Sequence, residues 1–231
     1  MEGRFRGTRC GVRARRRQFG IPVFMERQLW HGACSGITIS RYRFRETQVT
    51  IADDIFAIFD SRGSATYFGE SVSTTEHCLQ TAHFAQEEHA SASLVLAALL
   101  HDIGHLVAPT PDDIAEWTDD AHHERIGGGW LSRRFGREVS EPVRLHVPAK
   151  RYLIATRPEY FARLSPASVL TLKLQGGAMT AAEIAAFETE PFYREAVCLR
   201  EWDDHGKIAG LSTPDLRSYR QLIESEHARI A

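Results

Sequence analysis

Apolar positions along the chain predict a succession of helices, one of which is strongly apolar. Residues 91–100 read SASLVLAALL, which is typical of a helix buried on all sides. This run leads directly into His-Asp-Ile-Gly-His at residues 101–105. Imidazoles and a carboxylate at the end of a buried helix are costly to desolvate without a partner. A divalent metal ion removes that cost, because neutral imidazole and ionised carboxylate are its ligands.

The chain from about residue 49 onward carries further helix signals. The segment 51–63 has an apolar stripe at helical spacing and ends at a glycine. Other helices are predicted at 71–89, at 121–136, in a short stretch that ends near His146 because Pro148 stops it, at 165–177, and twice within 179–207. Residues 106–120 contain two prolines and five acidic residues, and we expect a loop or lid there. Strand signals are nearly absent, so the pattern predicts an all-α fold.

The length and composition of the chain predict one domain, and its charge distribution sets the N-terminal segment apart from the rest. A chain of 231 residues that is 43% hydrophobic can build one sizeable core. Residues 1–50 hold eleven arginines and three glutamates, whereas the whole chain has a net charge of −2. We therefore expect residues 1–48 to be an Arg-rich extension, peripheral or disordered, or added from an upstream start codon with Met25 as the true start. The domain itself is expected at 49–231.

The charge, hydropathy and cysteine spacing of the chain disfavour several classes of function. The overall charge gives no attraction to nucleic acid, and no stretch approaches a membrane span. The four cysteines show no CxxC spacing, so neither a zinc knuckle nor a redox pair is indicated. The Arg-rich start lacks the apolar segment of a secretory signal. We therefore expect a cytoplasmic protein.

Candidate metal ligands are distributed over the predicted helices, with one or two polar residues in each. They are His77, His101, Asp102, His123, His146 and Asp203. Helices that each turn one such residue inward are how bundle cores build carboxylate and histidine sites. Four of these residues could hold one ion, and the two extra histidines would complete a second ion with Asp102 bridging.

At this point the sequence resembles a known family. The order of the six candidates resembles the HD-domain superfamily in its dinuclear form, and it is most similar to the mixed-valent diiron oxygenases that cleave 1-hydroxyphosphonates, the PhnZ-like relatives of myo-inositol oxygenase. The resemblance covers roughly residues 50–225. It is carried by YFGE at 67–70, EHCLQTAHFA at 76–85, LAALLHDIGH at 96–105, HHERIGG at 122–128, HVPAKRYL at 146–153, LQGGAM at 174–179 and EWDDHGK at 201–207.

The resemblance implies a role for each matching residue. The six candidates would be iron ligands, with Asp102 bridging an Fe(II)/Fe(III) pair and with His123, not His122, as the ligand of the HHE motif. Tyr67 and Glu70 match the pair that gates the open iron and contacts the amine end of the substrate. His105, Lys150, Ser168 and Thr171 match positions that hold the phosphonate. For a quaternary ammonium substrate, Tyr67, Phe68 and Tyr152 are candidates for an aromatic cage.

The resemblance also implies a reaction. With dioxygen as co-substrate, a 1-hydroxy-2-aminoethylphosphonate-type compound would be cleaved oxidatively at its C–P bond. The products would be inorganic phosphate and a carboxylic acid, namely glycine or an N-methylated analogue. The substrate supplies all four electrons, so no external reductant is required. A 2-oxoglutarate-dependent hydroxylase would supply the 1-hydroxyphosphonate.

Two other classes of function remain open from the sequence. The first is an ordinary HD-type phosphohydrolase, which would act on a nucleotide or phosphoester with many of the same ligands and without dioxygen. Both extra histidines, Tyr67 and Glu70 weigh against it. The second is a ligand-sensing module that keeps a metal for structure, and the complete ligand set with its candidate anion pocket argues against it.

Overall fold

The fold is all-α, as the hydrophobic pattern predicts. The structure, a computed structural model, describes residues 49–108 and 122–230, so the Arg-rich extension and most of the expected loop lie outside the described residues. Within these ranges there is no strand, and no helix has both the length and the apolar character needed to cross a bilayer. The helices are α1 (Ile51–Arg62), α2 (Thr74–Glu87), α3 (Ala92–Leu100), α4 (Ile103–Val107), α5 (His123–Leu131), α6 (Arg137–Thr156), α7 (Pro166–Leu174), α8 (Ala181–Phe187), α9 (Tyr193–His205) and α10 (Arg220–Ala228), with short 3-10 turns at Phe161–Arg163 and Leu216–Tyr219.

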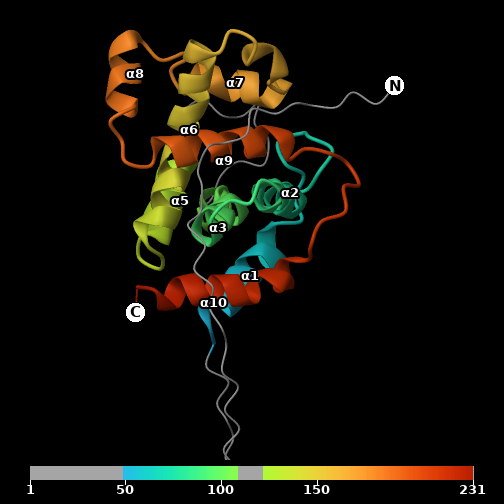
Figure 1. Ribbon diagram of the computed structural model, residues 1–231. Helices are drawn as coiled ribbons and strands as arrows, with labels where there is room; N and C mark the ends of the chain where they lie inside the picture. Colours follow the sequence, from blue (N-terminus) through green and yellow to red (C-terminus); the bar gives the residue numbers. More distant parts are fainter. Residues whose placement is uncertain (1–48, 109–121, 231) are drawn as a thin grey trace, which may run out of the picture. The chain divides into compact units, whose positions relative to one another are not determined.

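Helix α3 occupies the centre of the core. Ser91 caps its N-terminus by accepting a hydrogen bond from the backbone N–H of Leu94, and every residue from Ser93 to Leu100 is buried. The helix packs against α2, α6, α9 and α10, which surround it in Figure 1. The prediction of a buried helix at 91–100 is confirmed. Its C-terminal end therefore delivers His101 and Asp102 into the interior.

Helix α6 corrects one expectation from the sequence. It does not end near His146 but continues through Pro142 and Pro148 to Thr156. Each proline removes one backbone hydrogen bond, which disfavours a helix interior. The packing of α6 against α3, α5 and α9 offsets that loss, because half of its residues are buried. As a consequence His146 and Lys150 lie one turn apart on the same continuous helix.

Helix α5 is shorter than predicted, because the chain turns to bury Phe135 in the core. The sequence suggested a helix over 121–136, whereas α5 ends at Leu131. The backbone N–H of Phe135 bonds to the Leu131 carbonyl at 2.8 Å, and the Phe135 ring is buried in the core. Burial of this ring brings the chain round to the start of α6.

Close approach of backbones fixes the contact between α4 and α5. A Cβ built on Gly104 would lie 2.0 Å from the carbonyl oxygen of His123, so only glycine fits there. Gly127 of α5 faces the same contact, with its virtual Cβ 3.2 Å from the Gly104 backbone nitrogen. The glycine of the HDIGH motif is thus a packing residue that brings His123 near Asp102.

Helix α7 is tied to α6 through the glycine pair that ends it. Gly176 and Gly177 have φ values of 92° and 71°, which favour glycine, and the Gly177 N–H bonds to the Leu172 carbonyl. The Nε of Arg151 on α6 donates a 2.9 Å hydrogen bond to the Gly177 carbonyl. The predicted Ser cap, with proline in the first turn, is confirmed at Ser165. These contacts hold α7 beside the buried face of α6.

We predict that Gly104→Ala lowers the free energy of unfolding by about 2–4 kcal/mol, because the added methyl group meets backbone atoms that cannot move without separating α4 from α5. Urea denaturation at a fixed metal concentration measures the change. Gly129→Ala is the matched control: Gly129 is also helical and has open space around its virtual Cβ, so alanine there is neutral or stabilises by up to about 1 kcal/mol. Equal effects of the two substitutions would contradict the packing role.

Candidate metal centre

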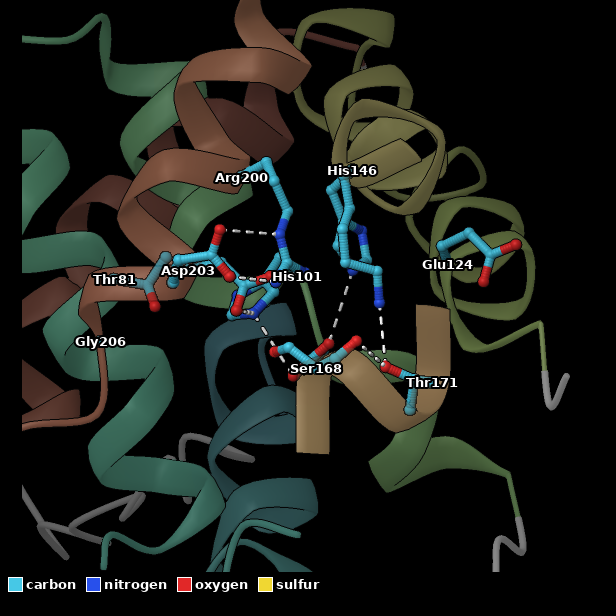
Figure 2. Close-up of polar contacts among 12 residues, drawn as sticks. Thr81, His101, Glu124, His146, Ser168, Thr171, Arg200, Asp203 and Gly206 are labelled. Carbon is cyan, nitrogen blue, oxygen red and sulfur yellow. Dashed lines mark hydrogen bonds and ion pairs between the residues drawn. The ribbon is translucent and has the colours of Figure 1, made fainter. Parts of the chain in front are cut away.

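All six candidate ligands converge in the interior, although they come from different parts of the chain. They are provided by α2 (His77), the end of α3 (His101), the start of α4 (Asp102), the start of α5 (His123), α6 (His146) and α9 (Asp203). Each is at most 7% exposed. Figure 2 shows His101, His146 and Asp203 on separate helices with their side chains facing a common centre.

The first group of ligand atoms is formed by His77, His101 and Asp203. The Nε2 atoms of the two histidines lie 3.0 Å apart, and Asp203 Oδ1 lies 3.4 Å from His77 Nε2. The three donor atoms lie within 4.8 Å of one another, close enough to bind one ion. The Tyr67 ring stacks on His77 with a centroid distance of 3.9 Å and covers this group.

The second group is formed around His123 and His146. Their Nε2 atoms lie 3.1 Å apart, and Asp102 Oδ1 lies 3.4 Å from His123 Nε2 and 3.8 Å from His146 Nε2. His105, expected at the substrate, also lies within ligand distance of His123 and Asp102. The His105 ring stacks on His123 with a centroid distance of 4.0 Å.

Asp102 lies between the two groups with one carboxylate oxygen toward each. Its Oδ2 is 3.3 Å from His101 Nε2, whereas its Oδ1 faces His123 and His146. A carboxylate in this position can bridge two cations. Asp102 is therefore shared by the two groups of candidate ligand atoms.

Backbone carbonyls fix the orientation of three of the histidines. The Nδ1 atoms of His77, His101 and His146 lie 2.8, 2.9 and 2.7 Å from the carbonyl oxygens of Gly206, Ala98 and Val143. An Nδ1–H that donates to a carbonyl leaves the Nε2 lone pair for a metal ion, which is the usual second-shell arrangement around ligating histidines. This tautomer is the one a metal site requires.

The surroundings of the Asp102 and Asp203 carboxylates show whether a cation fits between the histidines. Asp102 Oδ2 and Asp203 Oδ1 are buried and accept no hydrogen bond within the described ranges. Burial alone would raise the pKa of Asp102 and Asp203, but the adjacent histidines, with Arg200 beside Asp203, outweigh it and hold both pKa values well below the usual range. Buried, ionised oxygens that face bare imidazole nitrogens need positive charge between them. The residues fit a metal centre.

The pKa values of the histidines also fit a metal centre. Burial lowers the pKa of His146 to about 4, so this imidazole is neutral and available as a ligand. For His101, burial opposes protonation, but Asp102 raises its pKa to about 9. A proton on His101 and a metal ion are alternative ways to supply the charge that the carboxylates need, so metal binding will release protons.

Arg200 is a site residue that the sequence analysis missed. Its guanidinium is buried, donates a 2.6 Å hydrogen bond to Asp203 Oδ2 and also pairs with Asp204. Tyr160 donates a hydrogen bond to the same Asp204. Arg200 thus holds Asp203 by one oxygen, as Figure 2 shows, while the other oxygen of Asp203 faces His77 Nε2 at 3.4 Å. The signal was available, since Arg200 precedes Asp203 and Asp204 by one helical turn.

A pocket opens directly beside the second ligand group. Its lining includes the ligands Asp102, His123, His146 and Asp203 together with His105, Tyr67, Phe68, Val147, Lys150, Ala167, Ser168, Thr171, Gln175, Arg200 and Lys207. The predicted substrate residues Tyr67, His105, Lys150, Ser168 and Thr171 are therefore brought together. Gln175 and Lys207 join them, although the sequence analysis assigned a site role to neither.

The part of the pocket contributed by α6 and α7 is suited to an anion. Lys150 is only 2% exposed, and its Nζ donates a 2.9 Å hydrogen bond to Thr171 Oγ1. Lys207 Nζ lies 3.1 Å from Ser168 Oγ. Figure 2 shows the hydroxyls of Ser168 and Thr171 turned from α7 toward the helices that carry the ligands. Ammonium and hydroxyl donors that meet at one point are typical of a phosphate or phosphonate site.

Glu70 and Tyr152 are placed differently from the other expected substrate residues. Glu70 is not among the residues that line the pocket; it closes the tight turn Tyr67–Glu70, in which Phe68 and Gly69 have positive φ values of 45° and 76°. Its Oε1 is buried and has no hydrogen bond in the described part of the chain. Tyr152 was a wrong candidate for an aromatic cage, because its hydroxyl bonds to Glu188 and its ring packs on Phe187 away from the pocket.

Comparison with known proteins agrees with this architecture. The HD domain family matches residues 74–204, which span the ligands from His77 to Asp203. The chain belongs to the HD-domain family. The predicted fold and the resemblance to this family are therefore confirmed.

Two relatives bring the comparison closer to a particular chemistry. The chain is 46% identical over 177 residues to the hydroxymethylphosphonate dioxygenase of Gimesia maris, covering 75% of this chain and 88% of that protein. It is 42% identical over 174 residues to the glycine-betaine-forming [1-hydroxy-2-(trimethylamino)ethyl]phosphonate dioxygenase of Leisingera caerulea, covering 75% and 89%. Both are named as dioxygenases of hydroxyphosphonates, the group that the sequence motifs resemble.

We predict that Asp102→Ala abolishes tight metal binding at both groups, because each group loses a carboxylate oxygen and the negative charge that offsets a bound cation. Elemental analysis after dialysis measures the metal content per chain, and circular dichroism confirms that the helices remain. Asp60→Ala removes an exposed carboxylate and should leave the metal content unchanged. One full equivalent retained by Asp102→Ala would argue against a bridging carboxylate.

We predict that sulfate binding to the pocket weakens as the pH rises through about 7. Burial, with Arg200 nearby, lowers the pKa of Lys150 to about 7, so Lys150 loses its charge over the range in which sulfate stays a dianion. Bound sulfate raises this pKa, so the midpoint in calorimetric titrations will lie somewhat higher. Lys150→Met should bind weakly at every pH, whereas Lys173→Met, which alters an exposed lysine on α7, should keep the dependence. A flat profile in the unaltered protein would contradict the assignment.

Proposed function

We propose that this HD-domain protein is an oxygenase that cleaves the C–P bond of a 1-hydroxyphosphonate. The observation that carries the proposal is that one pocket contains both ligand residues and anion donors: His123, His146 and Asp102 line it together with Lys150 and Thr171. A substrate whose phosphonate is bound at the donors would have its neighbouring carbon beside the metal ligands. The names of the two relatives support the same reaction class.

We further propose that the six ligands hold two iron ions in a mixed-valent Fe(II)/Fe(III) state. The shared carboxylate of Asp102 and the two histidine pairs support a dinuclear site. When bound, the ions would supply Lewis acidity toward the substrate hydroxyl and the redox chemistry that dioxygen requires. The protein contributes the positions of the ligands and the exclusion of water.

The residues of the chain then act by binding and orienting the substrate. Lys150 provides a compact positive charge for the phosphonate, and the Ser168 and Thr171 hydroxyls, one turn apart on α7, donate to its oxygens. His105, stacked on His123, lies where it can contact the same group. Tyr67 lies between the first ligand group and the pocket, and we propose that it and Glu70 gate access to the open metal position.

The reaction balances without a reductant. A 1-hydroxyphosphonate and one dioxygen molecule give one carboxylic acid and one phosphate, because the substrate carbon and its C–P bond supply four electrons. The product is glycine from 2-amino-1-hydroxyethylphosphonate and the N-methylated analogue from its methylated form. The substrate must come from a reaction that hydroxylates the carbon next to phosphorus, and a 2-oxoglutarate-dependent hydroxylase is the enzyme class we propose.

The first experiment measures dioxygen uptake and phosphate release by the iron-loaded protein. Three substrates are compared: hydroxymethylphosphonate, (R)-2-amino-1-hydroxyethylphosphonate and its N-trimethyl analogue. We expect phosphate to appear in a 1:1 ratio with dioxygen consumed from at least one of them and to stop under nitrogen. Asp102→Ala serves as the inactive control and Lys173→Met as the active one. Phosphate released equally well under nitrogen would overturn the oxygenase in favour of the hydrolase.

A further inference from the structure

The histidines of the two ligand groups differ in how their rings are held. The Nδ1 atoms of His101 and His146 each lie within hydrogen-bond distance of the backbone carbonyl three residues earlier, inside α3 and α6. The geometry of those helices fixes both acceptors. The acceptor for His77 is the carbonyl of Gly206, which is 129 residues further along the chain and lies just past the end of α9. Its position therefore depends on tertiary contacts.

Gly206 lies against α2 because it has no side chain. A Cβ at this position would be 2.7 Å from Thr81 Oγ1 and 3.1 Å from His77 Nδ1, so a larger residue would move the backbone away from the helix. Thr81 is itself fixed, since its Oγ1 donates a 2.8 Å hydrogen bond to the His77 carbonyl (Figure 2). The glycine thus allows its own carbonyl to reach the His77 ring.

Gln80 holds the next part of the same segment. The Ile208 N–H donates a 2.9 Å hydrogen bond to Gln80 Oε1, and Gln80 Nε2 donates a 2.8 Å hydrogen bond to the Ile208 carbonyl. The Gln80 side chain is buried and lies one turn after His77 on α2. Buried amide groups are costly to leave without partners, so these two bonds fix the Ile208 backbone firmly. The helix that carries His77 therefore also holds the segment that carries its acceptor.

The segment 206–208 also joins two ligands of the first group. It continues directly from α9, and the Gly206 N–H bonds to the carbonyl of Asp203 at 3.2 Å. Asp203 Oδ1 in turn lies 3.4 Å from His77 Nε2. Holding the segment against α2 thus helps to fix the spacing of His77 from Asp203. The histidines of the second group lie on α5 and α6 and receive no hydrogen bond from this segment in the described parts of the chain.

We propose that Gln80 is a positioning residue for the first ligand group. Through its hydrogen bonds to Ile208 it places the Gly206 carbonyl at His77, and it thereby sets the affinity of that group, but not of the second, for its ion. The inference rests on the proposed two-ion centre and involves neither the substrate nor dioxygen. Partners that orient a ligating histidine typically change metal affinity tenfold to a hundredfold, on the order of the effect expected here.

Competition with a chromophoric chelator measures the two zinc affinities of the protein without turnover. Gln80→Met keeps the length of the side chain and removes both hydrogen bonds to Ile208, so we expect one zinc ion to bind about tenfold more weakly and the other to be unaffected. Gln86→Met is the matched control, because Gln86 lies on the same helix and accepts one hydrogen bond from Tyr219 instead. Equal weakening of both ions, or of neither, would overturn the proposal.

Proton exchange at the imidazole rings identifies the group that is affected. In the zinc-loaded protein we expect slowly exchanging Nδ1–H resonances from His77, His101 and His146. Gln80→Met should accelerate exchange at His77 alone, since the other two acceptors lie inside helices. Unchanged exchange at His77, or faster exchange at all three, would contradict a specific positioning role. A protein that binds a single zinc ion would contradict the two-ion centre, and this measurement would still decide whether Gln80 positions His77.

Gly206→Ala tests the same segment from its other end and also serves if Gln80→Met fails to fold. The added methyl group meets Thr81 and displaces the carbonyl that faces His77, so we expect the same selective loss of one zinc ion. In the double variant the loss should be little larger than in either single variant, because both act through one carbonyl. Additive losses would show that Gln80 and Gly206 act independently and would overturn the proposed path.

Discussion

The structure depends on the burial of two carboxylates, Asp102 and Asp203, at the centre of a helical bundle. Both are ionised, and each has an oxygen that accepts no hydrogen bond in the described part of the chain. A pair of unbalanced buried carboxylates would cost more than a small domain can tolerate. Positive charge must therefore reach them, and Arg200 and the surrounding imidazoles supply only part of it. The rest can come from a metal ion or, in its place, from a proton on His101.

The packing of the helices fixes the positions of the candidate ligands and of the pocket lysines. Because α6 continues through two prolines, the candidate ligand His146 and the pocket lysine Lys150 are held one turn apart on one helix. On α9 and the segment that follows it, Asp203 and Lys207 repeat this pairing of a ligand with a cation four residues later. Helix α7 lies across both and supplies hydroxyls to each lysine. The spacing of each candidate ligand from its lysine is thus set by one turn of α6 in one case, and by the end of α9 and the segment after it in the other.

The sequence predicted that the six candidate ligands would converge, which the structure shows, because their signals are local. His101 and Asp102 follow an apolar helix, and the remaining ligands fall in separate amphipathic helices, so convergence could be inferred from the pattern alone. The path of α6 could not, since proline normally stops a helix and only tertiary packing from α3, α5 and α9 reverses that rule. Lys207 was missed for a related reason: its partner Ser168 lies on another helix, and no spacing rule for a single element reveals a contact between two elements. Arg200 differs, because it precedes Asp203 and Asp204 by one turn of the same helix and helical spacing could have revealed it.

The arginine and the lysines of the pocket have different kinds of partner, because their side chains present their charge differently. Arg200 presents a planar fork whose donors are matched by Asp203 and Asp204, and it therefore fixes a ligand without competing for the substrate. Lys150 and Lys207 bond to hydroxyls, which are weaker partners that an incoming dianion can replace or share. Under the function proposed above, these hydroxyls keep the two lysines in place before the substrate arrives, and the phosphonate then gives them a stronger partner. The arrangement favours a ligand that carries two negative charges on one end, since a single charge would leave one of the two lysines without its counterpart.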